Sequence, residues 1–297
     1  MNGRPLPPSR DLRLVHVDAR ERQSVVSLRA GGPSFGGEEL AICAGPCAVE
    51  SREQIVATAA AVARAGANVL RGGAYKPRTS PYSFQGLGRD GLAMMREAAD
   101  LHGLAVVTEV LDPRDAEIVA ASAEMLQIGA RNMQNTALLR AVGETGKPVL
   151  LKRGLAATVD EWLLAAEYIA LTGNEQIVLC ERGIRSFDPS TRNLLDLSVV
   201  PLLARRTHLP TIVDPSHGTG IAALVAPMGL AAIAAGAAGI MVEVHPDPGS
   251  AVSDGMQSLT FAEFDSFMES MPAVAAAVGR RLPKRFAAAT LNVTTPP

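Results

Sequence analysis

Two groups of side chains in this sequence have the chemistry of a reactive site. The first is cationic, and its densest part is the stretch LRGGAYKPRTSP at residues 70–81, where three cations, two adjacent glycines and two prolines follow an apolar run. The second group combines a thiol, an imidazole and two carboxylates, and its members stand at or just after other apolar runs. The residue types in each group indicate the ligand it would suit.

The cationic group suits a small ligand with several negative charges. Arginine forks pair with carboxylate or phosphate oxygens, and lysine adds a compact charge. Gly72 and Gly73 would let the backbone pass close to such a ligand, and Pro77 would stiffen the loop. A single cation at a strand end is usually an ordinary solvated residue, but a set at several strand ends is harder to explain in that way. The set consists of Arg71, Lys76, Arg78, Arg131, Lys152 and Arg182.

The second group consists of Cys47, His217, Glu243 and Asp254. Thiol and imidazole ligands suit transition metals, and carboxylates extend the choice towards Mn or Fe. The spacing is not that of a zinc finger. Each residue also has an ordinary alternative: Cys47 as a buried small side chain or reactive thiol, His217 as a general base or structural residue, and Asp254 as a turn or helix cap. A metal site is therefore one of several interpretations of this group.

Eight short apolar runs alternate with longer stretches of helical spacing, which is typical of a parallel sheet with crossover helices. The runs are 40–45, 67–72, 104–110, 124–129, 148–152, 176–181, 211–215 and 239–245. Capping boxes at Ser51 and Thr158, and the pairs Asp112-Pro113 and Asp188-Pro189, indicate where helices begin.

This alternation of eight strand-like runs with helical stretches predicts an α/β protein with a single TIM (β/α)8 barrel. The alternative, a doubly wound open sheet, usually has a glycine-rich turn after its first strand, and AGPCAVES is no such turn. We expect a short N-terminal arm or extension at 1–35, the barrel at 36–282 and a C-terminal tail at 283–297. Because active sites of this fold lie at the carboxyl ends of the strands, both reactive groups should meet around one mouth.

Composition narrows the functional classes. The chain has 297 residues, a formal net charge of −2 and 47% hydrophobic residues, so we expect no general nucleic-acid binding. Three cysteines give no disulfide framework, and Cys43 and Cys180 lie inside strands as packing residues. The apolar stretch 221–244 is interrupted by Pro227 and ends near Glu243, which favours a buried helix and a strand over a membrane span. With no apolar leader at the N-terminus, the expected location is the cytoplasm.

Several motifs, in order from about residue 36 to 260, resemble one enzyme family. They are AGPCAVES, LRGGAYKPRTSPYSFQGLG, QIGARNMQN, LLKRG, ERGIR, DPSHGTG and VEVHPDP followed by SDGMQSL. The family is 3-deoxy-D-arabino-heptulosonate-7-phosphate (DAHP) synthase, in its short microbial form related to 3-deoxy-D-manno-octulosonate-8-phosphate (KDO8P) synthase. The resemblance implies a metal-dependent, aldol-like condensation of phosphoenolpyruvate with erythrose 4-phosphate, the first step of the shikimate pathway.

The resemblance also implies roles for individual residues. The ligands of a divalent metal, Mn first with Fe, Co or Zn as alternatives, would be Cys47, His217, Glu243 and Asp254. The phosphate of phosphoenolpyruvate would bind Arg131, Lys152 and Arg182, and its carboxylate end Arg71 and Lys76. Arg78 and Thr79 would take the phosphate of the aldose. The candidate catalytic residues are Lys76, Glu109 and His217.

Other activities stay open beside this one. In the octulosonate enzymes the KPRTSP stretch resembles KANRSS, so Pro77 and Arg78 favour the four-carbon sugar, but a sister synthase that uses another phosphorylated aldose is an alternative. A weakly active partner subunit of a chorismate mutase and an unrelated phosphate-binding barrel are two more. The resemblance implies a homodimer or homotetramer. Without the extra regulatory domain that some relatives carry, we expect little feedback inhibition by aromatic amino acids unless a partner protein supplies it.

Overall fold

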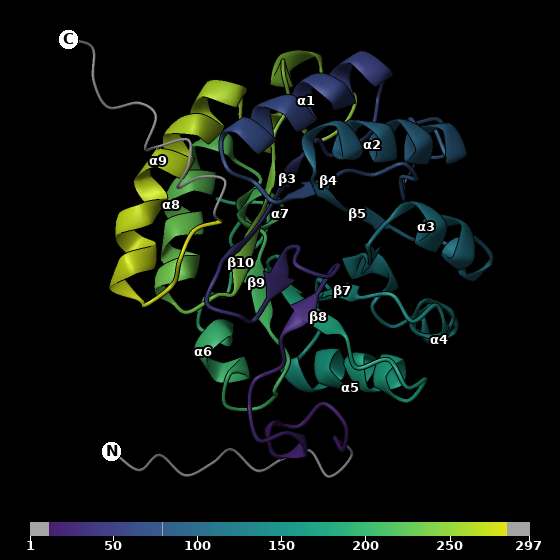
Figure 1. Ribbon diagram of the computed structural model, residues 1–297, viewed down its shortest axis with the longest axis vertical. Helices are drawn as coiled ribbons and strands as arrows, with labels where there is room; N and C mark the ends of the chain where they lie inside the picture. The colour runs from purple at the N-terminus through teal and green to yellow at the C-terminus, as the bar shows by residue number, and fades with distance from the viewer. Residues whose placement is uncertain (1–11, 79, 284–297) are drawn as a thin grey trace.

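The computed structural model, which describes residues 12–78 and 80–283, is built around a closed barrel of parallel strands surrounded by helices (Figure 1). The barrel strands are β3 (Ala41–Gly45), β4 (Val69–Arg71), β5 (Ala105–Glu109), β6 (Met125–Ile128), β7 (Val149–Lys152), β8 (Ile177–Glu181), β9 (Thr211–Val213) and β10 (Gly239–Glu243). Each of the eight predicted runs contains one of these strands, and the predicted TIM barrel is confirmed.

Neighbouring strands follow one another around the barrel, and β10 closes it against β3. The closing register runs from Gly239 opposite Ala41 to Glu243 opposite Gly45. Gly45 has a φ of 152°, and a Cβ atom there would lie 2.0 Å from the carbonyl oxygen of Arg71 on β4. Only glycine therefore lets β3 and β4 approach so closely where they enter the site.

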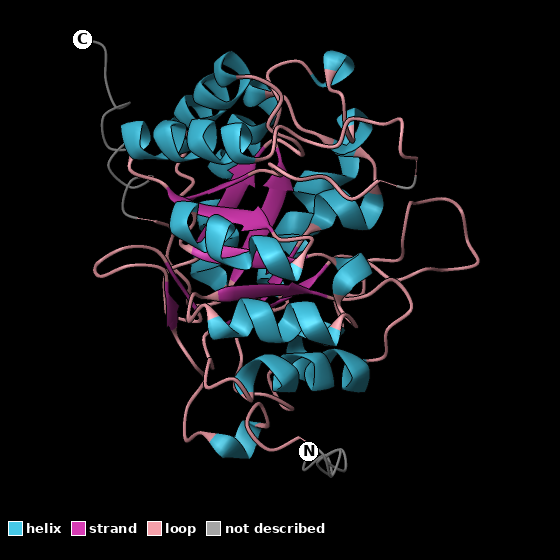
Figure 2. Ribbon diagram, turned by 90° about the vertical axis from the view of Figure 1, so that its right-hand side faces the viewer, coloured by secondary structure: helices cyan, strands magenta, loops and turns pink. Residues whose placement is uncertain are grey.

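The outer helices are α1 (Arg52–Arg64), α2 (Arg89–His102), α3 (Ala116–Ser122), α4 (Thr136–Glu144), α5 (Val159–Ala170), α6 (Val199–Leu203), α8 (Ala222–Ala234) and α9 (Phe261–Ala277). A short helix, α7 (Pro215–Thr219), follows β9 directly. Side chains between this ring and the strands form the main apolar core, and Figure 2 shows the strands enclosed by the helices. The predicted last helical segment, near 260–280, is α9, which packs against α8 and α1.

Side-chain caps start several of these helices as the sequence predicts. Thr158 and Glu161 form a full capping box at α5. Ser51 accepts a hydrogen bond from the Gln54 backbone at α1, but the Gln54 side chain bonds the backbone N–H of Glu50, so the reciprocal half of this box is shifted by one residue. Asp112 caps a short 3-10 helix, Pro113–Asp115, just before α3.

The predicted helix start at Asp188-Pro189 is wrong. Asp188 accepts hydrogen bonds from the backbone and hydroxyl of Ser190. No helix begins between this residue and Val199, where α6 starts. The backbone of this loop bonds elsewhere: Arg192 donates to the Thr219 carbonyl and Asn193 to the Gly218 carbonyl. These bonds lay the β8–α6 loop along α7 and take up backbone N–H groups that a helix starting at Pro189 would use.

The described part of the N-terminal segment packs at the end of the barrel where the strands begin. It contains a 3-10 helix, η1 (Val17–Ala19), and an antiparallel pair, β1 (Val26–Ser27) and β2 (Ser34–Phe35). Val26, Leu28 and Phe35 share one buried cluster with inward-facing strand residues, including Cys43 and Cys180, which confirms these cysteines as packing residues. The carboxylate of Glu167 on α5 accepts three backbone N–H groups, of residues 13–15.

The apolar stretch 221–244 folds as α8 followed by β10, as predicted. Within the described residues no helix has both the length and the apolar character needed to cross a membrane.

The close approach at Gly45 gives a test of the barrel. In Gly45→Ala the new Cβ meets the Arg71 carbonyl, adding about 1–3 kcal/mol of overpacking to about 1–3 kcal/mol of backbone strain. Gly146→Ala is the matched control, because Gly146 has a φ of 69° with nothing near its Cβ position and should lose only the strain. Urea unfolding should give a clearly larger loss of unfolding free energy for Gly45→Ala. Equal losses would contradict the packing described for β3 and β4.

Candidate active site and metal centre

A cavity of about 530 Å³ opens at the carboxyl ends of the barrel strands. It is lined by Lys76, Pro77, Arg78, Ser80, Ser83, Glu109, Ala130, Arg131, Leu155, Arg182, Arg185, Arg192, Asn193, His217 and Asp254. The remaining predicted site residues are also buried: Cys47 bonds Lys76 and Asp254, Arg71 bonds Glu243, and Lys152 bonds Asp214, which in turn bonds His217. Thr79 lies outside the described residues. The fold thus brings both reactive groups to one mouth.

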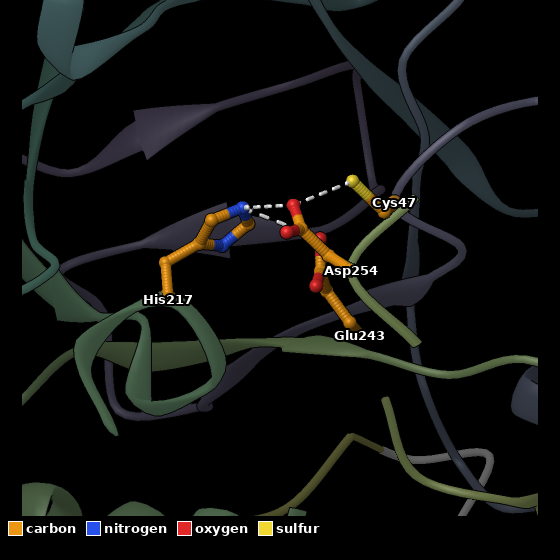
Figure 3. Close-up of side chains that lie close together, drawn as sticks. All are labelled: Cys47, His217, Glu243 and Asp254. Atoms are coloured by element: carbon orange, nitrogen blue, oxygen red, sulfur yellow. Dashed lines mark hydrogen bonds and ion pairs between the residues drawn. The ribbon is translucent and has the colours of Figure 1, made fainter. Parts of the chain in front are cut away.

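Cys47, His217, Glu243 and Asp254 form a compact cluster, with one ligand atom from each lying within 4.8 Å of the others. Figure 3 shows the four side chains converging from separate segments. Cys47 Sγ lies 3.2 Å from Asp254 Oδ2, and His217 Nε2 lies 3.3 Å from Glu243 Oε1. One sulfur, one nitrogen and two carboxylate oxygens at this spacing fit a divalent transition metal.

A buried carboxylate, Asp214, orients the imidazole of His217. Asp214 caps α7 through the backbone N–H of His217, and its Oδ2 lies 2.8 Å from His217 Nδ1 and 2.6 Å from Lys152 Nζ. Since the carboxylate accepts the Nδ1 proton, the Nε2 lone pair faces the cluster. Burial would raise the pKa of Asp214, but in acid the protonated His217, together with Lys152, outweighs it and holds the pKa well below its ordinary value.

Burial and neighbouring charges set the protonation of the other groups. Burial lowers the pKa of His217, and attraction to Asp214 and Glu243 offsets this only in part, which favours the neutral imidazole that a metal needs. Burial would raise the pKa of Asp254, but His217 and Arg192 lower it to about 2. His217 and Asp254 are therefore in the protonation states in which they can bind a cation.

Cys47 keeps its proton when no cation is bound. Burial, reinforced by Glu243, raises the pKa of its thiol to about 12, although Lys76 opposes the shift. The Lys76 ammonium lies 2.9 Å from Cys47 Sγ and donates to the Cys47 carbonyl as well. A metal bound here would have to displace the thiol proton, and the adjacent ammonium helps to stabilise the resulting thiolate.

Several buried cations at the site are only partly paired. Arg71 bonds Glu243 at 2.8 Å and Lys152 bonds Asp214, yet Arg71 Nε, Arg78 Nη2 and Arg182 Nη1 have no partner among the described residues. Each buried unpaired donor costs about 1–3 kcal/mol, so these groups are poised for an acceptor that enters the cavity. Burial also lowers the pKa of Arg182. Arg131, by contrast, stands exposed on the cavity wall.

Glu109 lines the cavity at the end of β5, where its Oε2 lies 3.4 Å from the amide of Gln127. The sequence interpretation missed the roles of Arg185 and Arg192 in the cavity wall. The predicted helix start at Asp188-Pro189 would place Arg192 in an outer helix, away from the cavity, whereas the structure places it in the cavity wall. Arg185 stood in the recognisable string ERGIR, which is a signal that could have found it.

Comparisons with known proteins show similarity to one enzyme family over most of this chain. A family model described as the DAHP synthetase I family matches residues 23–278. A phospho-2-dehydro-3-deoxyheptonate aldolase of Thermotoga maritima is 53% identical over 267 residues, which cover 90% of this chain and 78% of that protein. A 2-dehydro-3-deoxyphosphooctonate aldolase of Rhodopseudomonas palustris is 34% identical over 272 residues, which cover 85% of this chain and 94% of that protein.

Two solved structures are also similar to this chain in fold and sequence. The crystal structure of the DAHP synthase of Thermotoga maritima has a TM-score of 0.89 and 51% identity, covering 92% of this chain and 79% of that one. A truncated form of the Thermotoga enzyme has a TM-score of 0.84 over 91% of this chain. The resemblance seen in the motifs is confirmed, and this chain belongs to the DAHP synthetase I family.

Proposed function

We propose that this protein condenses phosphoenolpyruvate with erythrose 4-phosphate to give DAHP and inorganic phosphate. One observation carries the proposal: the cavity joins buried, unpaired arginine donors to a four-ligand cluster that suits a divalent metal. The donors match a substrate with phosphate and carboxylate groups, and the cluster matches a metal-assisted carbonyl reaction. The family and the name of the Thermotoga relative support the same reaction.

The cations divide between the charged groups of the two substrates. Arg131, Lys152 and Arg182 would hold the phosphate of phosphoenolpyruvate, and Arg71 and Lys76 its carboxylate. Arg78 and Thr79 would receive the phosphate of the sugar. Clamping phosphoenolpyruvate at both ends fixes which face of its C3 meets the aldehyde, and this orientation lowers the entropic part of the barrier.

Cys47, His217, Glu243 and Asp254 would hold the metal, with Mn proposed first and Fe, Co or Zn as alternatives. When bound, the metal supplies Lewis-acid polarisation of the aldehyde oxygen or orients the attacking water. The metal dependence of this chain is part of the proposal.

The bond changes define what the protein groups must do. A C–C bond forms between C3 of phosphoenolpyruvate and the aldehyde carbon, and water adds at C2. The C2–O bond to phosphate then breaks with its electron pair going to the phosphate, while the C2 hydroxyl becomes the ketone and its proton passes to the leaving phosphate. The aldehyde oxygen gains a proton, for which Lys76 Nζ is the proposed donor, and the added water loses one, for which Glu109 is the proposed acceptor. His217 is held by Asp214 with Nε2 towards the cluster, so its proposed role is that of a ligand more than of a base.

A second candidate function is a sister synthase that uses a five-carbon phosphorylated aldose. The 34% identity to octulosonate aldolases favours it, whereas the KPRTSP loop and the 53% identity to the heptonate aldolase favour the four-carbon sugar. A homo-oligomeric state, a chorismate mutase partner and a cytoplasmic location stay predictions from the sequence.

The substrate choice can be tested by phosphate release. Metal-stripped protein, supplied with phosphoenolpyruvate and Mn²⁺, should release phosphate with erythrose 4-phosphate at least tenfold faster than with arabinose 5-phosphate. It should release none without metal, because the aldehyde is then not polarised. Preference for arabinose 5-phosphate would assign the sister activity, and equal rates with and without metal would refute the metal-dependent mechanism.

The metal cluster can be tested at its thiol. Cys47→Ala removes one of four ligands and should lower both the bound Mn²⁺ and kcat by at least about 100-fold, as measured by elemental analysis and phosphate release. Cys180→Ala is the control, because Cys180 is equally buried in the barrel interior but lies outside the cluster. It should keep the metal at reduced stability. Full metal content in Cys47→Ala would contradict the ligand assignment.

Phosphoenolpyruvate binding can be tested at Arg182. The substrate at 100 times its Kd should stabilise the native protein by about 2.7 kcal/mol. Arg182→Met should abolish this thermal shift without lowering the stability of the ligand-free protein, because it removes a buried donor that has no partner among the described residues.

The control for Arg182→Met is Arg153→Met, which breaks a buried ion pair with Glu181 and should destabilise the protein by about 3–5 kcal/mol. An unchanged ligand shift in Arg182→Met would remove Arg182 from the binding site.

A further inference from the structure

Gln257 is a buried amide, 2% exposed, in the loop between β10 and α9. Its Nε2 lies 2.5 Å from Glu243 Oε2, and its Oε1 lies 2.8 Å from Arg192 Nη1. It lies beside the metal cluster without offering it a ligand atom. Neither Gln257 nor Arg192 has a role in the mechanism described above.

The chemistry of its two neighbours settles how the Gln257 amide is turned. A guanidinium can only donate and an ionised carboxylate can only accept, so the amide oxygen must face Arg192 and the NH₂ must face Glu243. No flipped arrangement keeps both bonds. The two hydrogen bonds therefore run in one direction: Arg192 donates to Gln257, and Gln257 donates to Glu243. Each is a charge-assisted hydrogen bond.

We propose that Gln257, together with Arg192, is a positioning residue that aims both carboxylate ligands at the metal. This inference rests on the proposed metal site and goes beyond its ligands. It assigns to Gln257 the rotation of the Glu243 carboxylate, and to Arg192 the rotation of the Asp254 carboxylate.

Each of the two carboxylates has one oxygen at the cluster and the other bonded to Gln257 or Arg192. Glu243 turns Oε1 to the cluster, 3.3 Å from His217 Nε2 and 2.8 Å from Arg71 Nη1, while Oε2 is held by Gln257. Asp254 turns Oδ2 to the cluster, 3.2 Å from Cys47 Sγ, while Oδ1 is held 3.2 Å from Arg192 Nη1. Each carboxylate thus presents one oxygen inward and has the other tied to the same pair of residues.

Arg192 also ties the segments that carry the ligands. Its backbone N–H bonds the Thr219 carbonyl at the end of α7, the helix that bears His217. Its side chain reaches the β10–α9 loop, where Asp254 adopts a left-handed backbone with a φ of 54°. A non-glycine residue in this conformation needs support from its surroundings, and Arg192 supplies it through its bond to Asp254 Oδ1.

Partners that orient metal ligands typically contribute 10- to 100-fold to metal affinity. Gln257→Met keeps the size of the side chain but removes both bonds, so we expect Mn²⁺ to bind 10- to 100-fold more weakly in equilibrium dialysis of metal-stripped protein. In a Co²⁺ titration the thiolate-to-cobalt absorption should still appear, because Cys47 is intact, but at correspondingly higher cobalt concentration.

Asn174→Leu is the control for loss of a buried amide, since Asn174 bonds the Gly143 and Lys147 carbonyls far from the cluster. It should lower the melting temperature and leave the Kd for Mn²⁺ within twofold of the native value. Gln257→Met should show the opposite pattern, with a small change in melting temperature of the metal-free protein and a large change in Kd.

Arg192→Met provides a second variant that should fold, because its side chain is 38% exposed. It should weaken Mn²⁺ binding by at least fivefold, and the double variant should lose less affinity than the two single losses combined, since the residues act through one shared bond. If Gln257→Met does not fold, the result for Arg192→Met decides.

The outcomes separate this inference from the proposed function. If the native protein binds Mn²⁺ and the variants have a Kd within twofold of the native value, the positioning role is overturned but the metal site is retained. Native protein that binds no Mn²⁺ would overturn the metal site and the positioning role together.

Discussion

The pairing of β10 with β3 is the constraint on which the site depends. It sets Glu243 opposite Gly45, two residues before Cys47, although the two segments lie about two thirds of the chain length apart. The β10–α9 loop then falls beside the same strand end, so that Asp254 reaches Cys47 across 207 positions of sequence. A one-residue slip would turn Glu243 to the other face of the barrel wall and remove it from the cluster.

Charge balance among buried groups is the second requirement of this arrangement. Glu243 is bonded to Arg71 and Asp214 to Lys152, so the fold offsets these two buried carboxylates with buried cations. A buried ion pair contributes little net stability, and its value here lies in orientation. Asp214 turns the imidazole, Arg71 and Gln257 turn Glu243, and the same cations keep donors free for a substrate. The geometry of the site therefore depends on these buried contacts.

The sequence predicted the strands and most residues of the candidate site for a physical reason. Strands of a parallel barrel are buried on both faces and read as continuous apolar runs, and the residue ending each run marks the catalytic face. That rule alone brought Cys47, His217 and Glu243 together. It could not find Gln257 or Arg192, whose contacts join two loops. Nor could it reject a helix at Asp188-Pro189, where backbone bonds to residues 218 and 219 override a good local start signal.

The central claim is that the metal cluster and the cationic cavity form one catalytic centre. A crystal structure of the protein with Mn²⁺ and phosphoenolpyruvate, with anomalous data at the Mn edge, tests it most directly. The account predicts one anomalous peak among Cys47, His217, Glu243 and Asp254, and a phosphate bound by Arg131, Lys152 and Arg182 in the same cavity. A peak away from these ligands, or phosphoenolpyruvate bound outside that cavity, would contradict it.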